Sequence, residues 1–184
     1  MSTKTASTIE DLYKVEGKAE LVDGEIVLMS PTGAESGYAG DEIFVSLRDY
    51  SRRTGTGRAV GDNKAFRVDL PHRKSFSPDA AFYVGVDTGM KFYEGAPVFA
   101  AEVRSEGDYG EMAEQRMAAK RADYFAAGTQ VVWDVDLLSE EVVRVYRAGE
   151  PERPHVYRRG ELAEAEPAVP GWRMAVDDLF ADAG

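Results

Sequence analysis

Short β-rich runs alternate with two long helix-like segments along this chain, and this alternation limits the possible folds more than any other feature. Residues 38–54 carry apolar side chains at helical spacing and stop at Gly55, and residues 110–127 are rich in Ala, Met and Glu and stop at Gly128. The strand-like runs lie at residues 19–29, 58–61, 65–70, 76–85, 96–105, 129–136 and 141–146. Many strands with few helices predict an α/β or α+β fold, in which helices cover at least one face of a mixed sheet.

Local signals add detail at the two ends of the chain. Thr8 is a candidate cap for a short helix over residues 9–15, and Asp23-Gly24 is a hairpin turn signal. The last 40 or so residues hold scattered strand signals and a helix-like segment at 176–182. Because no repeat or linker interrupts the pattern, we expect one domain over residues 1–184, in which residues 1–7 form a flexible N-terminal tail.

Composition excludes several classes of site. The chain has no cysteine, so it holds no disulfide and no thiolate nucleophile, and its two histidines, His72 and His155, argue against a multi-histidine metal centre. The formal net charge of −11 weighs against bulk attraction to nucleic acid or to anionic membranes. No apolar run approaches the ~20 residues that span a bilayer, and the N-terminus lacks a signal-peptide core. We therefore expect a cytoplasmic protein.

Glu102 is a carboxylate inside an otherwise apolar strand. Alternation places Val98, Ala100 and Glu102 on one face of the run 96–105. A buried carboxylate needs a cationic partner, a metal ion or a raised pKa. The alternative is that the strand already reaches the surface at Glu102, where the carboxylate pairs with a nearby arginine.

Lys120 interrupts the apolar stripe of the later helix. The other members of that stripe are apolar or aromatic: Ala113, Met117, Tyr124 and Ala127. Either Lys120 extends along the edge of the stripe into solvent, or it points toward a polar group on the sheet below.

Asp79 follows Pro78 at the start of a strand-like run, where it is either a turn residue or part of a site. Since Asp79 and Glu102 lie on consecutive strand-like segments, hairpin-like pairing can bring their carboxylates together, and the helix with Lys120 packs on the same sheet. Two close carboxylates repel unless a cation lies between them, and oxygen ligands suit Mg²⁺ or Mn²⁺. A lysine beside such a metal orients water and stabilises charge on a phosphate. The three residues together predict metal-assisted phosphodiester hydrolysis.

Four segments of the chain resemble the Uma2 family, long described as a domain of unknown function, DUF820. They are SPDAAF (77–82), APVFAAEVRSEGD (96–108), KRADYFAAGTQVVWDVD (120–136) and the hairpin AELVDGEIVLMSPTG (19–33). The resemblance covers residues 8–148 and continues more weakly after them. The family belongs to the PD-(D/E)XK, restriction-endonuclease-like superfamily. The resemblance therefore implies a restriction-endonuclease-like core, with a mixed central sheet flanked by helices, and an endonuclease activity.

The resemblance also assigns roles to residues. It implies that Asp79, Glu102 and the backbone carbonyl of Val103 bind Mg²⁺ or Mn²⁺. The superfamily lysine that normally follows two residues after the glutamate is absent. The family pattern K-x-x-x-Y supplies it instead from the next helix, where Lys120 positions the attacking water.

Three further positions bear on this assignment. Glu20 matches an N-terminal glutamate that assists at the site, although a solvated hairpin carboxylate is an equal alternative. Arg104 stands where the superfamily has its usual lysine. Family members also carry a histidine shortly after the S-P-T-G turn, where this chain has Ser36 or Gly37.

Basic side chains in the middle of the chain are candidates for binding a phosphate backbone locally, although a solvated helix face and a charged loop are the alternative. With the aromatic Tyr124, the candidate nucleic-acid contacts are Arg48, Arg52, Arg53, Lys64, Arg67, Arg73 and Lys74. The favoured hypothesis is a Mg²⁺-dependent nuclease of nucleic acid, with DNA as the expected substrate and a homodimer as a plausible assembly. The alternatives are an inactive binding module of the same fold and a hydrolase of small phosphorylated molecules.

Overall fold

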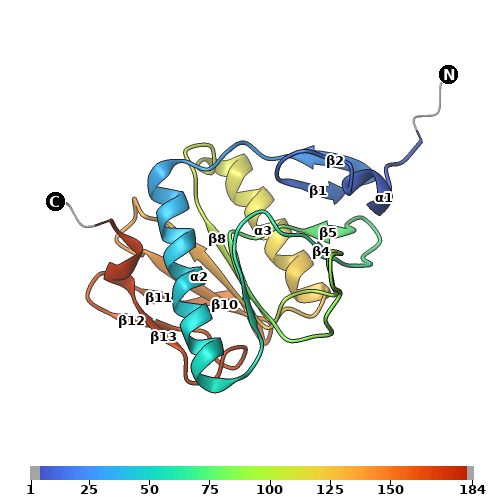
Figure 1. The fold of residues 1–184 in the computed structure, drawn as a ribbon. Helices are drawn as coiled ribbons and strands as arrows, with labels where there is room; N and C mark the ends of the chain where they lie inside the picture. The colour runs from blue at the N-terminus through green and yellow to red at the C-terminus, as the bar shows by residue number, and fades with distance from the viewer. Residues whose placement is uncertain (1–4, 182–184) are drawn as a thin grey trace.

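A six-stranded mixed sheet forms the centre of the molecule in the computed structural model, which describes residues 5–181 (Figure 1). Its strands, in the order in which they pair, are β11 (Glu150–Tyr157), β10 (Val143–Arg147), β9 (Val131–Val135), β8 (Phe99–Val103), β6 (Ala80–Tyr83) and β3 (Arg58–Val60). β8 and β9 pair in parallel and the other neighbours are antiparallel. The parallel pair needs a crossover connection, and a helix provides it.

Two helices cover opposite faces of this sheet. On β8, Phe99 and Ala101 belong to the core packed with α2 (Ala34–Thr54), whereas the intervening Ala100 belongs to the core packed with α3 (Glu111–Ala126). The alternation along one strand therefore sends successive side chains into two different cores.

Three smaller sheets surround the central one. They consist of β1 (Ala19–Val22) with β2 (Glu25–Leu28), of β4 (Phe66–Arg67) between β5 (Ser75–Phe76) and β7 (Tyr93–Glu94), and of β12 (Leu162–Glu164) with β13 (Arg173–Ala175). The short helices α1 (Ile9–Leu12) and η1 (Val176–Leu179) complete the elements. In Figure 1 the β1–β2 hairpin and strands β4 and β5 lie on one side of the molecule, and β11 to β13 lie on the other.

The mixed α/β class predicted from the sequence is confirmed, and most differences concern boundaries. α2 begins at Ala34 rather than near residue 38. The predicted strand over residues 76–85 is divided, because Ser77-Pro78-Asp79 separates β5 from β6. Pro78 lacks the N–H that an uninterrupted ladder would use.

Two expectations about strands need correction. β11 is an eight-residue edge strand, whereas the sequence showed only scattered strand signals there. Its side chains are mostly exposed, and Pro151 and Pro154 break the alternation of apolar and polar residues that would have indicated a strand. Val98 lies just before β8 and packs with the α2-side core, so it does not share the face of Glu102 as alternation suggested.

The structure describes only residues 5–7 of the N-terminal tail that we expected over residues 1–7. Residues 1–4 of the predicted flexible tail lie outside the described residues, and the Ser7 amide at its end donates a hydrogen bond to the Gly24 carbonyl at 2.8 Å. Between residues 5 and 181, no helix has both the length and the apolar character needed to cross a membrane.

Candidate active site

Asp79, directly before β6, lies beside Glu102 of the adjacent strand β8. β6 pairs antiparallel with β8 so that Ala80 is opposite Ala101, and Asp79 directly precedes β6 at the end of β8 where Glu102 lies. The Asp79 amide donates to the Ala101 carbonyl at 3.1 Å, and its Oδ2 accepts the Val103 N–H at 2.7 Å. The backbone of β8 therefore holds the Asp79 carboxylate next to Glu102.

Lys120 points into the molecule, toward the sheet. Its Nζ lies 2.8 Å from Glu102 Oε1 and 2.8 Å from Glu20 Oε1, and its side chain is 18% exposed. The Tyr124 hydroxyl, one helical turn later, donates to Glu102 Oε1 at 2.6 Å. Of the two orientations open to Lys120 from the sequence, the structure shows the one directed at the site.

Glu20 is buried in the same cluster, so it is not a solvated hairpin carboxylate. The hairpin packs over β5, and Glu20 Oε1 accepts the Ser77 N–H at 2.8 Å while Oε2 accepts from Arg73 Nη1 at 2.7 Å. Arg73 Nε donates in turn to Asp123 of α3 at 2.7 Å. The hairpin, β5 and α3 are thus joined by charged side chains around the predicted site.

The close charges shift the pKa values of the cluster. Burial alone would raise the pKa of Glu20, but Lys120 and Arg73 bring it below the ordinary value. Burial raises the pKa of Glu102, and the neighbouring Asp79 and Glu20 add to this effect against the opposing charge of Lys120. Burial opposes the charge of Lys120, yet Glu102 and Glu20 raise its pKa. Lys120 is therefore a cation and does not act as a base in this state.

Lys18 is a member of the cluster that the sequence analysis missed. Its Nζ lies 2.7 Å from Asp79 Oδ1 and 2.7 Å from Asp62 Oδ1, with the side chain 12% exposed. The available signal was its place two residues before Glu20, since strand alternation directs both side chains to the same side.

Comparison with known proteins identifies the family and the fold. The Uma2 family model, described as "Putative restriction endonuclease", matches residues 7–177. The chain belongs to the Uma2 family. Its fold is similar to the crystal structure titled as "a putative nuclease belonging to DUF820" from Anabaena variabilis, with a TM-score of 0.71, 17% identity, and coverage of 94% of this chain and 97% of that one. No curated protein matches the chain.

Arg104, which stands where the superfamily lysine is expected, is paired outside the cluster of Lys18, Glu20, Asp79, Glu102 and Lys120. Its guanidinium donates to both oxygens of Asp134, at 2.8 and 2.7 Å, and pairs with Glu114 on the first turns of α3. Arg104 therefore ties α3 to the sheet. The Ser36 hydroxyl, at the position of the family histidine, donates to the Arg104 carbonyl at 2.9 Å, so the start of α2 also contacts the end of β8.

Two of the predicted nucleic-acid contacts are buried and need correction. Arg73 is 6% exposed and is held by Glu20 and Asp123. Tyr124 is fully buried, with its ring stacked on Phe76 at a centroid distance of 4.0 Å. Neither side chain is presented to a strand on the surface.

The remaining basic candidates do not form one band. Arg52 and Arg53 lie in the last turn of α2, about 18 Å along the helix from Gly40, the residue that packs against Asp79. Lys64 lies much nearer to the cluster, because Asp62 pairs with Lys18 two residues earlier. The other three are Arg48, Arg67 and Lys74, of which Arg67 faces Glu94 at 4.0 Å and Lys74 pairs with Asp69 at 2.6 Å.

The donor set fits a hard cation in kind. Asp79, Glu102 and the Val103 carbonyl offer oxygen atoms, and Mg²⁺ is commonly held by one or two carboxylates with water in the other positions. Within residues 5–181, no group of three or more Asp, Glu, His or Cys side chains is arranged to hold a metal. Lys18 and Lys120 instead neutralise Asp79 and Glu102, so a cation between the carboxylates would compete with Lys18 for Asp79.

Proposed function

We propose that this chain is a metal-dependent nuclease that hydrolyses phosphodiester bonds of nucleic acid. The observation that carries the proposal is that Asp79, which accepts the N–H of Val103, lies next to Glu102, with the Lys120 ammonium 2.8 Å from Glu102. Asp79, Glu102 and the Val103 carbonyl would hold Mg²⁺ or Mn²⁺, which when bound polarises a phosphate oxygen and lowers the pKa of a coordinated water. Membership of the Uma2 family supports a nuclease over other hydrolases.

Three side chains have further roles in this proposal. Lys120 is a cation held by two carboxylates, so it positions the attacking water and stabilises negative charge that develops on the phosphate. Glu20 is the second carboxylate that holds the Lys120 ammonium, also at 2.8 Å. Tyr124 donates to Glu102 and restricts its rotamer, which keeps one carboxylate oxygen directed at the site.

The test is cleavage of single- and double-stranded DNA and RNA with Mg²⁺ or Mn²⁺. We expect Asp79→Asn and Lys120→Met to lower the rate at least about 100-fold, because each removes a charge that acts on the reacting phosphate. Asp87→Asn and Lys14→Met are matched controls, since their side chains are 71% and 74% exposed and lie outside the cluster. Absence of cleavage by wild type, or equal rates in all five proteins, would contradict the proposal.

One observation favours a second candidate, a binding module without catalysis. Both Asp79 and Glu102 already have lysine partners, so the cluster is electrostatically satisfied without a metal. Calorimetric titration with Mn²⁺ separates the two candidates. Binding that Asp79→Asn abolishes supports the nuclease, whereas no binding by wild type supports the module.

A further inference from the structure

A cavity of about 240 Å³ adjoins the charged cluster. Three of its lining residues are direct neighbours of cluster residues in the chain or by hydrogen bond. Ala19 precedes Glu20, Asn63 follows Asp62, and the amide of Ser77 donates to Glu20. A group bound in this cavity would therefore lie beside the segments that carry the carboxylates, on the side of β1 that Ala19 faces and Glu20 does not.

One end of the cavity is aromatic. Tyr13 and Phe92 stack with ring centroids 3.8 Å apart and an interplanar angle of 7°. The Phe92 N–H donates to the Tyr13 hydroxyl at 2.9 Å, which fixes the pair, although Tyr13 is 46% exposed. A fixed, partly exposed pair of rings is a platform on which another flat ring can stack with little loss of side-chain entropy.

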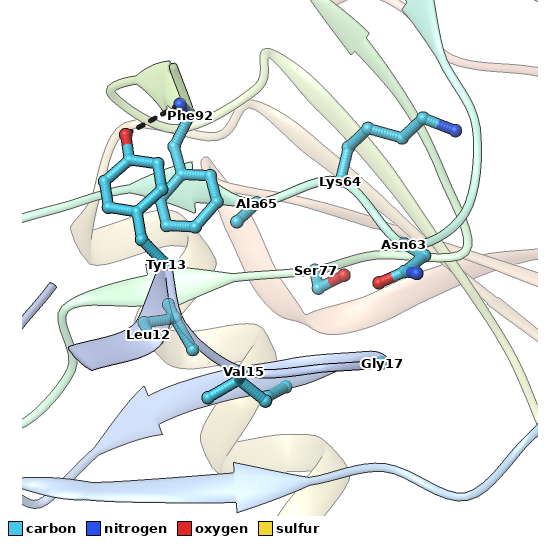
Figure 2. A pocket seen from close by; sticks show the side chains of 10 residues that line it. Leu12, Tyr13, Val15, Gly17, Asn63, Lys64, Ala65, Ser77 and Phe92 are labelled. Atoms are coloured by element: carbon cyan, nitrogen blue, oxygen red, sulfur yellow. Dashed lines mark hydrogen bonds between the residues drawn. The ribbon is translucent and has the colours of Figure 1, made fainter. Parts of the chain in front are cut away.

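The other end of the cavity is polar. Figure 2 shows Asn63 and Ser77 across the cavity from the two rings, with Lys64 beside them. No side-chain hydrogen bond is formed by Asn63 or by the Ser77 hydroxyl within residues 5–181, so both can bind a ligand. An Asn amide offers a donor and an acceptor together, which is the pattern presented by the edge of a nucleobase.

Charge and size narrow the kind of ligand. None of the lining residues is acidic and Lys64 is basic, in a chain whose net charge is −11. The volume is below the roughly 300–1,000 Å³ of sites for drug-sized ligands, so it suits one small ring system. A flat, neutral ring with polar edges and an adjoining phosphate meets all of these conditions.

We propose that this cavity binds a single unstacked nucleobase of the substrate, stacked on the Tyr13–Phe92 pair, with Asn63 and Ser77 at its edge. The inference rests on the proposed nuclease function, because it names how that site takes its substrate. Such a base is available in a single strand or after it is flipped out of a duplex. The enzyme would then favour unpaired or distorted nucleic acid over regular duplex.

The test uses nucleoside 5′-monophosphates in EDTA, where no metal-dependent cleavage occurs. Titration calorimetry compares the four common nucleotides with ribose 5-phosphate, which has the same sugar and phosphate but no base. We expect the nucleotides to bind at least about tenfold more tightly. Equal affinity for ribose 5-phosphate, or no binding of any nucleotide, would overturn the proposal without the need for a variant.

Variants then locate the base. Tyr13→Leu and Phe92→Leu should weaken all four nucleotides by roughly 5- to 100-fold, because stacking does not depend on base identity. Asn63→Gly should instead change the ratio among the four, and glycine tolerates the positive φ of 56° at this position. Tyr109→Leu is the matched control, with a tyrosine that is 39% exposed and hydrogen-bonded to Asp136 outside the cavity.

The outcomes separate this inference from the proposed function. Wild-type affinity in Tyr13→Leu and Phe92→Leu, or an unchanged ratio in Asn63→Gly, counts against the base site even if the protein cleaves nucleic acid. Loss of base-dependent affinity in the cavity variants, with normal binding by Tyr109→Leu, supports the site. That result stands whether or not Asp79→Asn alters cleavage.

Discussion

The two faces of the central sheet are built from the same strands, but only the α3-side face combines its apolar core with buried charges. Toward α2, β8 and β9 present Phe99 and Trp133, which pack with Trp172 in a continuous apolar core. Toward α3, the same two strands present Glu102 and Asp134, which are opposite each other in the β8–β9 register. Both faces bury apolar area, and the α3-side face also holds charges close together.

Glu20 and Asp134, two buried carboxylates on the charged face, each have cationic partners. Glu20 lies between Arg73 and Lys120, and Asp134 receives Arg104 and Arg121. Such pairs add little net stability, since desolvation offsets their attraction, but loss of one partner leaves the other buried and unpaired. The charged residues of the α3-side face are therefore costly to change singly although they add little net stability.

The largest stability change is expected on the α2-side face. Trp133→Ala should lower the free energy of unfolding by about 3–5 kcal/mol, because it removes a fully buried ring that stacks on Trp172 and contacts Phe99. Urea denaturation measures the loss. Mn²⁺ affinity of the folded fraction should be unchanged.

Trp133→Leu keeps this prediction measurable if the alanine variant does not fold, since a smaller cavity should cost less. A fall in Mn²⁺ affinity for this milder, folded variant would show that the two faces are coupled, contrary to the comparison.

How far the sequence predicted the molecule differs between the faces. The α2-side core could be predicted from periodicity, because apolar side chains at helical or strand spacing share one face of their element, and burying that face removes them from water. On the charged face, Glu102 and Lys120 were visible as breaks in that periodicity. Lys18 and Arg73 were not, because their partners, Asp79 and Glu20, are distant in the chain and only tertiary packing brings them together.

The second-largest expected loss of stability concerns Glu20. Glu20→Gln should lower the free energy of unfolding by about 3 kcal/mol at neutral pH, because Arg73 and Lys120 lose a buried counter-charge. A carboxyl whose pKa falls on folding stabilises the folded state at pH values above its ordinary pKa, here 4.5. This stabilisation is lost as the pH drops through the lower pKa of the folded state.

The difference between wild type and Glu20→Gln should therefore shrink as the pH is lowered below about 4.5. Denaturant midpoints measured from pH 7 to pH 3 give the curve. A difference that stays constant over this range would mean that the charge of Glu20 does not stabilise the cluster.

The smallest expected losses of stability come from removing the hydroxyls of two buried tyrosines on opposite faces. The Tyr124 hydroxyl donates to the Glu102 carboxylate at 2.6 Å, and the Tyr50 hydroxyl donates to the Pro170 carbonyl at 2.7 Å on the α2 side. Tyr124→Phe should cost about 1.5 kcal/mol and Tyr50→Phe about 1 kcal/mol, because a hydrogen bond to a charged acceptor is the stronger one. Tyr124→Phe should also lower nuclease activity, since Glu102 loses the donor that fixes its rotamer, whereas Tyr50→Phe should leave activity unchanged. Equal stability losses with equal activities would mean that the two faces do not differ in function at this position.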